Sequence, residues 1–450
     1  MVSFWRTKGM MRTVFALLVL AATLAAQLPA PHPFWEFDAV HDIYLFFESP
    51  NWYEQLRANF EGTDDPEYME ANLVWNEHSL QRVGIRFKGN SSYRTYPGQK
   101  KSFKIKTNKF VKGQRIAGID TFNLHNAFKD PSYVREKVYY ELARAAGLKA
   151  PRTNHAAVYI NGEYWGLYFL AEDVDGQFLE NHVGKDEDGN LYKGDPRGTL
   201  EWRGPDPEPY RREYEKDNNE DADDWSDLIQ FIDVLNRTPR EQLKERLDEL
   251  LDIDSAVSLL AVDNLTANLD SYIGSGHNYY VYHRKLDGKF MFIPWDPNEA
   301  FGNFNMGLTI NDLQRLPIQW LPRPQGLPGQ PPPPNATMPR PLAQRLWEVP
   351  EYRAAYLNKV KGLLEGAAEP ELLVGRMRAL HDFIRPHVER EARSMFTVAQ
   401  FERAMVENQR TGGPPQPGQP PVPGFDIPGL EPFVRVRAAS VLQQLAAMLP

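Results

Sequence analysis

The chain has 450 residues, 42% of them hydrophobic and 25% charged, with a formal net charge of -9 at pH 7. This composition is that of a globular protein long enough for two or three domains. The negative charge argues against a general role in binding nucleic acid. The sequence contains no cysteine, which excludes disulfides, thiolate nucleophiles and cysteine-based zinc sites.

The first 26 residues have the pattern of a secretory signal peptide. Arg6, Lys8 and Arg12 precede an apolar run over residues 14–22, and small residues spaced for signal peptidase follow it. The run is short for a membrane span, although an uncleaved N-terminal anchor is the alternative. We therefore expect a secreted or cell-envelope protein with no stable membrane span after cleavage.

Residues 35–175 are rich in strand signals. Residues 41–48, 82–88 and 101–106 read as strands, and Asn161-Gly162 joins 156–160 to 164–170 as a hairpin turn. A helix is predicted over residues 130–147, with an apolar stripe and a glycine at its end. We expect a β-rich, antiparallel N-terminal lobe here.

Residues 176–410 are predicted to be mostly helical, which makes the fold class α+β. Residues 184–224 are polar and mostly acidic, so we expect a solvated loop there. Further predictions are helices over 224–236, 239–251 and 253–268, helical structure throughout 342–409, a Pro-rich insertion over 321–341, a Pro/Gly linker over 411–424, and a C-terminal helix within 425–450 that packs on this lobe.

A hairpin near the middle of the chain carries the strongest chemical signal. Residues 279–282 and 290–293 are its arms, and Asp287-Gly288 is its turn. Asp270 precedes the hairpin, Asn278 begins it, and Asp296 ends it. An acid, an amide and a second acid in these places are the plan of a kinase active site, and oxygen ligands of this kind suit Mg²⁺.

The N-terminal part offers groups that bind phosphate. The turn Gly89, Asn90, Ser91 and Ser92 joins two strands, so its backbone N–H groups could hold phosphate oxygens. Its spacing is not GxGxxG, and an ordinary turn is the alternative. Lys100, Lys101 and Lys104 are candidates for a phosphate-binding lysine, and Glu136 or Glu141 for its partner. In a two-lobed kinase, backbone groups of residues 168–174, which include Glu172, would meet the adenine edge, and an ordinary strand end is the alternative.

Several of these segments resemble the CotH kinase family, named for spore-coat protein H. The similar segments occur in family order from about residue 40 onward. They are GIRFKGNSS (84–92), KKSF (100–103), DPSYVR (130–135), VYINGEYWGLY (158–168), Glu172, NLD (268–270) and WDPNEAF (295–301).

The resemblance implies a two-lobed, atypical protein-kinase-like fold and ATP-dependent phosphorylation of protein Ser/Thr residues with Mg²⁺ or Mn²⁺. By motif, Asp270 is the catalytic acid, Asp296 and Asn278 are the metal ligands, and Lys101 or Lys104 binds phosphate. No HRD-like or DFG-like tripeptide is present. Asn298 stands where the family commonly carries a second acidic residue, which puts metal affinity or preference in question.

Two other functions fit the sequence. One is a catalytically inactive, kinase-like surface protein used for adhesion or assembly, because fold does not dictate activity. The other is a metal-dependent hydrolase that uses Asp263, Asp270, His277 and Asp296. For the kinase, the expected partners are ATP and a protein substrate with Ser or Thr, and no nucleic acid.

Overall fold

The computed structural model describes residues 32–35, 38–63, 66–185, 188–324, 336–411 and 424–449. Residues Asp38–Pro450 form one compact unit, distinct from Met1–Phe37. The predicted signal peptide lies outside the described residues, as do the central parts of the Pro-rich insertion and of the Pro/Gly linker. The mixture of helix and sheet that the sequence predicted is confirmed.

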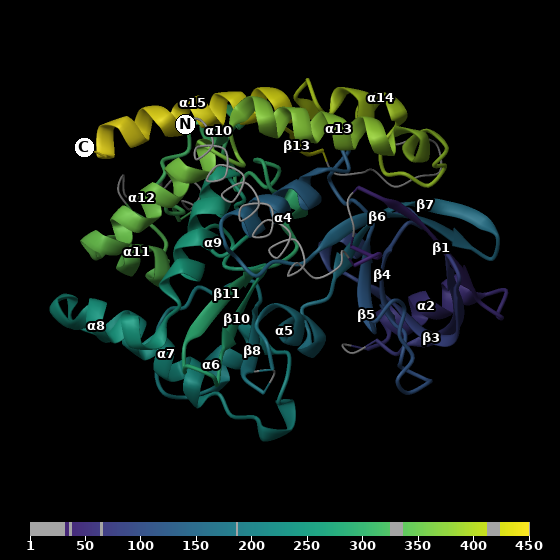
Figure 1. The fold of residues 1–450 in the computed structure, drawn as a ribbon, viewed down its shortest axis with the longest axis horizontal. Coiled ribbons are helices and arrows are strands. Elements are labelled where there is room, and N and C mark those ends of the chain that lie inside the picture. The colour runs from purple at the N-terminus through teal and green to yellow at the C-terminus, as the bar shows by residue number, and fades with distance from the viewer. Residues whose placement is uncertain are drawn as a thin grey trace, which may run out of the picture. The chain divides into compact units, whose positions relative to one another are not determined.

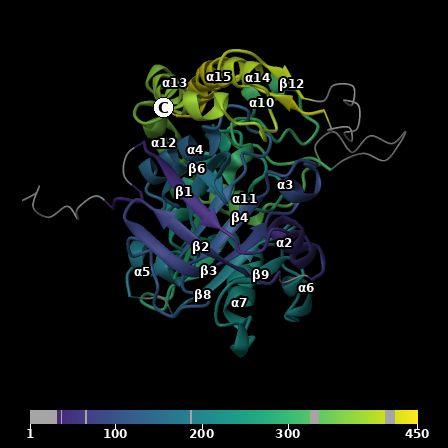
Figure 2. The same ribbon diagram turned by 90° about the vertical axis from the view of Figure 1, so that its right-hand side faces the viewer.

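Seven strands close into a barrel in the order β1-β2-β3-β4-β5-β7-β6 (Figure 1). The contact between β1 and β6 is parallel, and the other barrel pairs are antiparallel. Figure 2 looks onto β1, β2 and β3 lying side by side. The bounds are β1 (Val40–Phe46), β2 (Met69–Trp75), β3 (His78–Lys88), β4 (Ser102–Lys106), β5 (Thr121–His125), β6 (Thr153–Ile160) and β7 (Glu163–Glu172).

Side-chain alternation gives the barrel an apolar interior and a polar outer face. Phe87 is paired with Phe103 in register, and both are buried. The neighbouring register pairs Arg86 with Lys104, so these side chains lie on the opposite face. Strands β3, β4 and β5 therefore present polar and cationic groups outward.

Helix α4 (Arg135–Ala145) joins the barrel to the remainder of the unit. Its side chains Val138, Tyr139 and Leu142 belong to the same buried cluster as those of α9 (Ile253–Leu265). Most of α4 is buried, including the charged residues Arg135, Glu136 and Lys137, so these three side chains face either the core or a site.

A second sheet has the order β11-β10-β8-β9. The predicted hairpin is confirmed as β10 (Tyr279–His283) paired with β11 (Phe290–Pro294). The prediction of a loop over 184–224 was wrong in part, because β8 (Asn190–Gly194) and β9 (Tyr214–Lys216) extend the sheet. These strands are short and contain the charged residues Lys193, Glu215 and Lys216, which conceals them among polar residues.

Helices cover the second sheet and fill the C-terminal half (Figure 1). The predicted helical structure over 342–409 ends at α14, after which β12 (Gln409–Arg410) pairs with β13 (Asp426–Ile427). Among the described residues, no helix combines the length and hydrophobicity needed to cross a bilayer. The remaining helices are α2 (Trp52–Glu61), α3 (Ser91–Arg94), α5 (Gly176–His182), α6 (Glu208–Arg211), α7 (Ser226–Arg237), α8 (Arg240–Leu250), α10 (Ile310–Gln314), α11 (Pro341–Glu348), α12 (Pro350–Leu364), α13 (Pro370–Glu389), α14 (Val398–Arg403) and α15 (Leu430–Met448), with short 3₁₀ turns at Glu220–Ala222 and Pro297–Glu299.

Candidate active site

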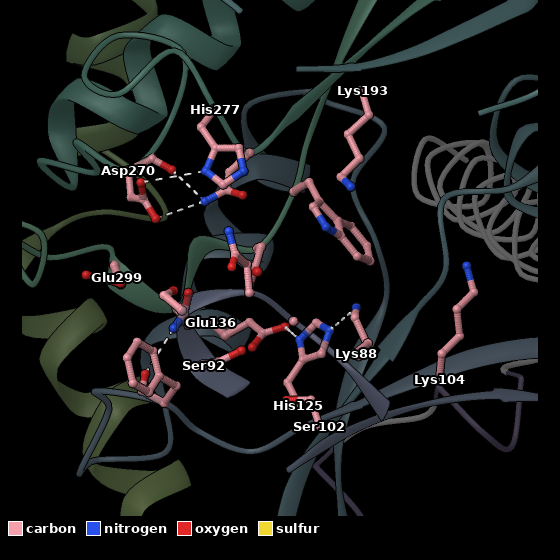
Figure 3. Close-up of a pocket in the computed structure, with 18 of the residues that line it drawn as sticks. Lys88, Ser92, Ser102, Lys104, His125, Glu136, Lys193, Asp270, His277 and Glu299 are labelled. Atoms are coloured by element: carbon pink, nitrogen blue, oxygen red, sulfur yellow. Dashed lines mark hydrogen bonds and ion pairs between the residues drawn. The ribbon is translucent and has the colours of Figure 1, made fainter. Parts of the chain in front are cut away.

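A pocket of about 330 Å³ lies between the polar outer face of the barrel and the second sheet (Figure 3). Its volume is in the range of small-molecule sites. Residues more than 200 positions apart in the sequence meet in it. The predicted site residues that line the pocket are Gly89, Asn90, Ser91, Ser92, Lys104, Glu136, Asp270, Asn278 and Asp296.

Three predicted site residues lie outside the pocket lining. Lys100 is buried and forms an ion pair with Glu391 at 2.6 Å. Lys101 Nζ donates a hydrogen bond to the backbone oxygen of Tyr93 at 2.7 Å. The predicted phosphate-binding roles of these two lysines are not supported, because both ammonium groups are used inside the fold where the chain enters β4.

Glu172 also has a structural role. Its carboxylate binds His182 Nε2 at 2.9 Å and forms an ion pair with Arg152 at the end of β7. These contacts hold its carboxyl pKa below the ordinary value, against burial, which raises it. The Glu172 side chain therefore does not line the pocket, whereas its neighbour Asp173 does, and the adenine edge at residues 168–174 stays a prediction.

Lys88, which the sequence analysis missed, occupies the centre of the pocket. Its Nζ lies 2.9 Å from His125 Nε2, and His125 Nδ1 lies 2.7 Å from Glu136 Oε1 (Figure 3). Since an ammonium group only donates, Nε2 accepts from Lys88 and the Nδ1–H donates to Glu136. Its position could have identified it from the sequence, because Lys88 ends a predicted strand directly before the turn that begins at Gly89.

Burial governs the ionisation of these three groups. It lowers the pKa of Lys88 to about 8 and that of His125 to about 3, so the ring is neutral near pH 7. Burial also raises the pKa of the Glu136 carboxyl to about 8. Perturbed groups gathered in one cleft are a mark of functional sites. Glu141, the other predicted lysine partner, binds Arg376 Nε at 2.9 Å instead.

Asp270 is fixed by the start of the hairpin. Asn278 Nδ2 donates to the Asp270 backbone oxygen at 2.9 Å and to its Oδ2 at 3.0 Å. Ser275 Oγ donates to Oδ1 at 3.0 Å, and His277 Nδ1 lies 3.9 Å from the same oxygen. Asn278 has a φ of 55°, a left-handed conformation that asparagine tolerates. The carboxylate is thus oriented before any ligand arrives.

Asp263 supports this loop from behind. It is fully buried, and its Oδ1 accepts hydrogen bonds from Tyr139 at 2.5 Å and from Asn268 Nδ2 at 3.1 Å. Burial raises the pKa of its carboxyl to about 7. Asp263 does not line the pocket, whereas Asp270, His277 and Asp296 do. The hydrolase alternative therefore loses one of its four proposed residues.

Asp296 follows β11 in a left-handed conformation with a φ of 46°. Its N–H donates to Tyr140 Oη at 3.1 Å, a contact that helps to hold this unfavourable conformation. One ligand atom each from His125, Glu136 and Asp296 lie within 4.8 Å of one another. Both His125 nitrogens already have hydrogen-bond partners, whereas the two carboxylates, with a buried Glu136 oxygen that lacks a hydrogen bond, fit a divalent metal ion.

The other part of the pocket, here called the Lys104 end, consists of Lys104, Asp173, Lys193, Glu215 and Asp217. Lys104 pairs with Asp173 at 2.7 Å, and Lys193 pairs with Glu215 at 2.8 Å. Burial raises the pKa of Asp217 to about 6. The residues Lys88, His125, Glu136, Asp270, Asn278 and Asp296 are called the Asp270 end.

Comparison with known proteins agrees with this geometry. Residues 85–409 match the family model described as CotH kinase protein. The chain is 25% identical over 374 residues to inner spore coat protein H of Bacillus subtilis, covering 80% of this chain and 91% of that protein.

Two further relatives come from Rhizopus delemar. Spore coat protein homolog 1 is 23% identical and the protein named Invasin CotH7 is 24% identical, over 62% and 61% of this chain. The chain spans 44% of the length of each. Among solved structures, the proinflammatory kinase CtkA of Helicobacter pylori matches with a TM-score of 0.29 and 8% identity over 73% of this chain and 90% of that chain, a similarity too low to bear on the fold.

The family model covers well over half of the sequence, and the matched segment includes the turn at 89–92, Glu136 and the whole hairpin with Asp270 and Asp296. The chain therefore belongs to the CotH kinase protein family.

Proposed function

We propose that this protein is an atypical kinase that transfers the γ-phosphoryl group of ATP to Ser or Thr of a protein, with Mg²⁺ or Mn²⁺. The observation that carries the proposal is the convergence of Asp270, Asn278 and Asp296 on one pocket that also holds Lys88. In this proposal the barrel and the helix-rich remainder correspond to the two lobes of the kinase.

Each end of the transferred group has a candidate partner. Asp270 accepts the proton of the acceptor hydroxyl while the hydroxyl oxygen forms a bond to the γ-phosphorus. The bond between that phosphorus and the β,γ-bridging oxygen breaks, which releases ADP. Lys88 and the N–H groups of the Gly89–Ser92 turn bind phosphate oxygens. Asp296 would hold a divalent ion, which would neutralise phosphate charge when bound.

The relatives suggest where this activity is used. Their names place them in spore coats or describe them as invasins. Together with the predicted signal peptide, these names favour a coat or cell-surface location. The same names support the second candidate function, an inactive kinase-like surface protein, which the absence of HRD-like and DFG-like tripeptides also favours.

The test is phosphate transfer by the chain without residues 1–26. We expect label from γ-labelled ATP on Ser or Thr of a generic acceptor protein with Mg²⁺ or Mn²⁺, and its loss in D270N and in D296N. The control D233N changes an exposed aspartate on α7 that pairs with Arg237. Label that persists in D270N and D296N would contradict these roles. No label and no metal-dependent ATP binding would favour the surface protein.

A further inference from the structure

The carboxylate of Glu136 is fully buried, and only one of its oxygens is satisfied. Oε1 accepts from His125 Nδ1 at 2.7 Å. Within the described part of the chain, no hydrogen-bond partner reaches Oε2. Burying a carboxylate oxygen without a hydrogen-bond partner costs free energy, and such oxygens in folded proteins usually bind a ligand, a water molecule or an ion.

Lys88 does not neutralise this carboxylate directly. In ordinary protein kinases the phosphate-binding lysine and the helix glutamate form an ion pair. Here the His125 ring stands between them, with Nε2 on Lys88 at 2.9 Å and Nδ1 on Glu136. Glu136 therefore receives a hydrogen bond from the ring, and the Lys88 ammonium group contacts the other ring nitrogen instead of the carboxylate.

Asp296 supplies the second carboxylate. Ligand atoms of Glu136, Asp296 and His125 all lie within 4.8 Å of one another. Two oxygens bound to one ion at metal–oxygen distances of about 2.1 to 2.5 Å can be separated by up to roughly 5 Å. The carboxylates therefore lie within the span of a single divalent ion.

Asn278 is the other predicted metal ligand, and Oδ1 is the atom through which its amide would bind an ion. Its Nδ2 donates two hydrogen bonds to Asp270. These contacts hold Asn278 beside the candidate catalytic carboxylate. The Asn278 amide oxygen stays available, and Glu136 would add an anionic oxygen to the site.

We propose that Glu136 and Asp296 together bind a divalent cation, Mg²⁺ or Mn²⁺, and that His125 orients Glu136 from behind. The inference rests on the proposed function for the role of this ion beside the phosphates, but binding of the ion requires no nucleotide. A histidine that donates to a ligating carboxylate fixes its orientation, as outer-shell groups do in metal sites. Helix α4 thus contributes a metal ligand in place of a lysine partner.

The test measures Mn²⁺ binding to the chain without residues 1–26, by the electron paramagnetic resonance signal of free Mn²⁺ and without ATP or acceptor. We expect E136Q and D296N each to bind Mn²⁺ at least tenfold more weakly than the wild type. H125Q should weaken binding by roughly tenfold or more, as changes in outer-shell groups do. The matched control is E141Q, a glutamate on the same helix that binds Arg376 outside the pocket.

Wild-type Mn²⁺ affinity in E136Q would overturn the proposal. E136Q keeps the shape of the side chain and replaces a buried carboxyl group with an amide, so its fold is checked by circular dichroism and thermal unfolding. If E136Q does not fold, the same comparison is made with E136D, whose shorter carboxylate should also bind at least tenfold more weakly. Wild-type affinity in E136D would equally overturn the assignment.

The outcome separates this inference from the proposed function. If E136Q loses Mn²⁺ binding but the wild-type protein transfers no phosphate, the metal site is supported and the proposed kinase activity is contradicted. If the wild type transfers phosphate but E136Q keeps wild-type Mn²⁺ affinity, the kinase activity is supported and the role of Glu136 as a metal ligand is contradicted.

Discussion

The two ends of the pocket contain similar numbers of charges but use them differently. At the Lys104 end, the cations are already paired, Lys104 with Asp173 and Lys193 with Glu215. At the Asp270 end, Lys88 rests on a neutral ring and Glu136 has an unsatisfied oxygen. A charged side chain that is already paired within the protein contributes less to binding a ligand. We therefore expect a charged ligand to gain the most binding free energy at the Asp270 end.

Lys88→Met should give the largest difference between the ends. Loss of a charge-assisted hydrogen bond worth about 1.5–3 kcal/mol corresponds to a roughly tenfold to hundredfold lower kcat/KM for ATP. The matched variant Lys104→Met should cost less than about tenfold, because that ammonium is paired with Asp173. Initial rates over an ATP series measure both, and equal losses would remove the distinction between the ends.

Gly89→Ala should have the next largest effect. Gly89 has a φ of +97°, which strains any residue with a Cβ, and that Cβ would lie 2.2 Å from Ser92 Oγ, so the Ser92 hydroxyl in the turn must move. We expect about a tenfold rise in KM for ATP. Gly288→Ala is the control, since its φ is +68° with no atom within 4 Å of the added Cβ, and it leaves only backbone strain. Equal KM values in the two variants would contradict a phosphate-binding turn.

Asp263→Asn tests the buried support beneath the Asp270 end. The folded pKa of Asp263 is raised to about 7 from an ordinary value of 3.8, so the folded state holds this proton more tightly. The associated stability is present below about pH 4 and is lost as the pH rises to about 7, by at most about 1.4 kcal/mol per pH unit. Urea unfolding across this range should show a flatter profile in D263N. Parallel profiles would contradict the buried proton.

Glu215→Gln should produce the smallest effect. The Lys193–Glu215 pair is partly exposed, with Glu215 53% accessible, and such pairs contribute little. We expect a change in KM for ATP below about threefold and a change in unfolding free energy within about 0.5 kcal/mol. A large rise in KM would show that the Lys104 end holds a charged part of the ligand after all.

The sequence predicted elements that depend on local signals. The β6–β7 hairpin has Asn161-Gly162, the β10–β11 hairpin has Asp287-Gly288, and α4 has its apolar stripe. Each pattern is short-range, so a single sequence contains enough information. The candidate residues Asp270, Asn278 and Asp296 were found because one hairpin holds them together.

The remaining features depend on barrel closure. The alternating pattern places four lysines in or next to strands: Lys88, Lys100, Lys101 and Lys104. Only the pairing of the strands shows which of these side chains point out of the barrel. His125 ends β5 and Glu136 lies on α4, and neither is near Asp296 in sequence. Their meeting is a consequence of tertiary packing, for which the sequence pattern has no local marker.

The buried Lys100–Glu391 pair limits how this chain can be divided. Lys100 lies in the barrel, whereas Glu391 follows α13, and its Oε2 also accepts from the backbone N–H of Leu167 in β7. A fragment that stops before residue 391 leaves a lysine charge in the interior without its counterion, at a cost of about 3–5 kcal/mol. The barrel is consequently unsuited to production as an isolated piece, and a genetic fusion or split-reporter insertion should keep residues 38–450 together.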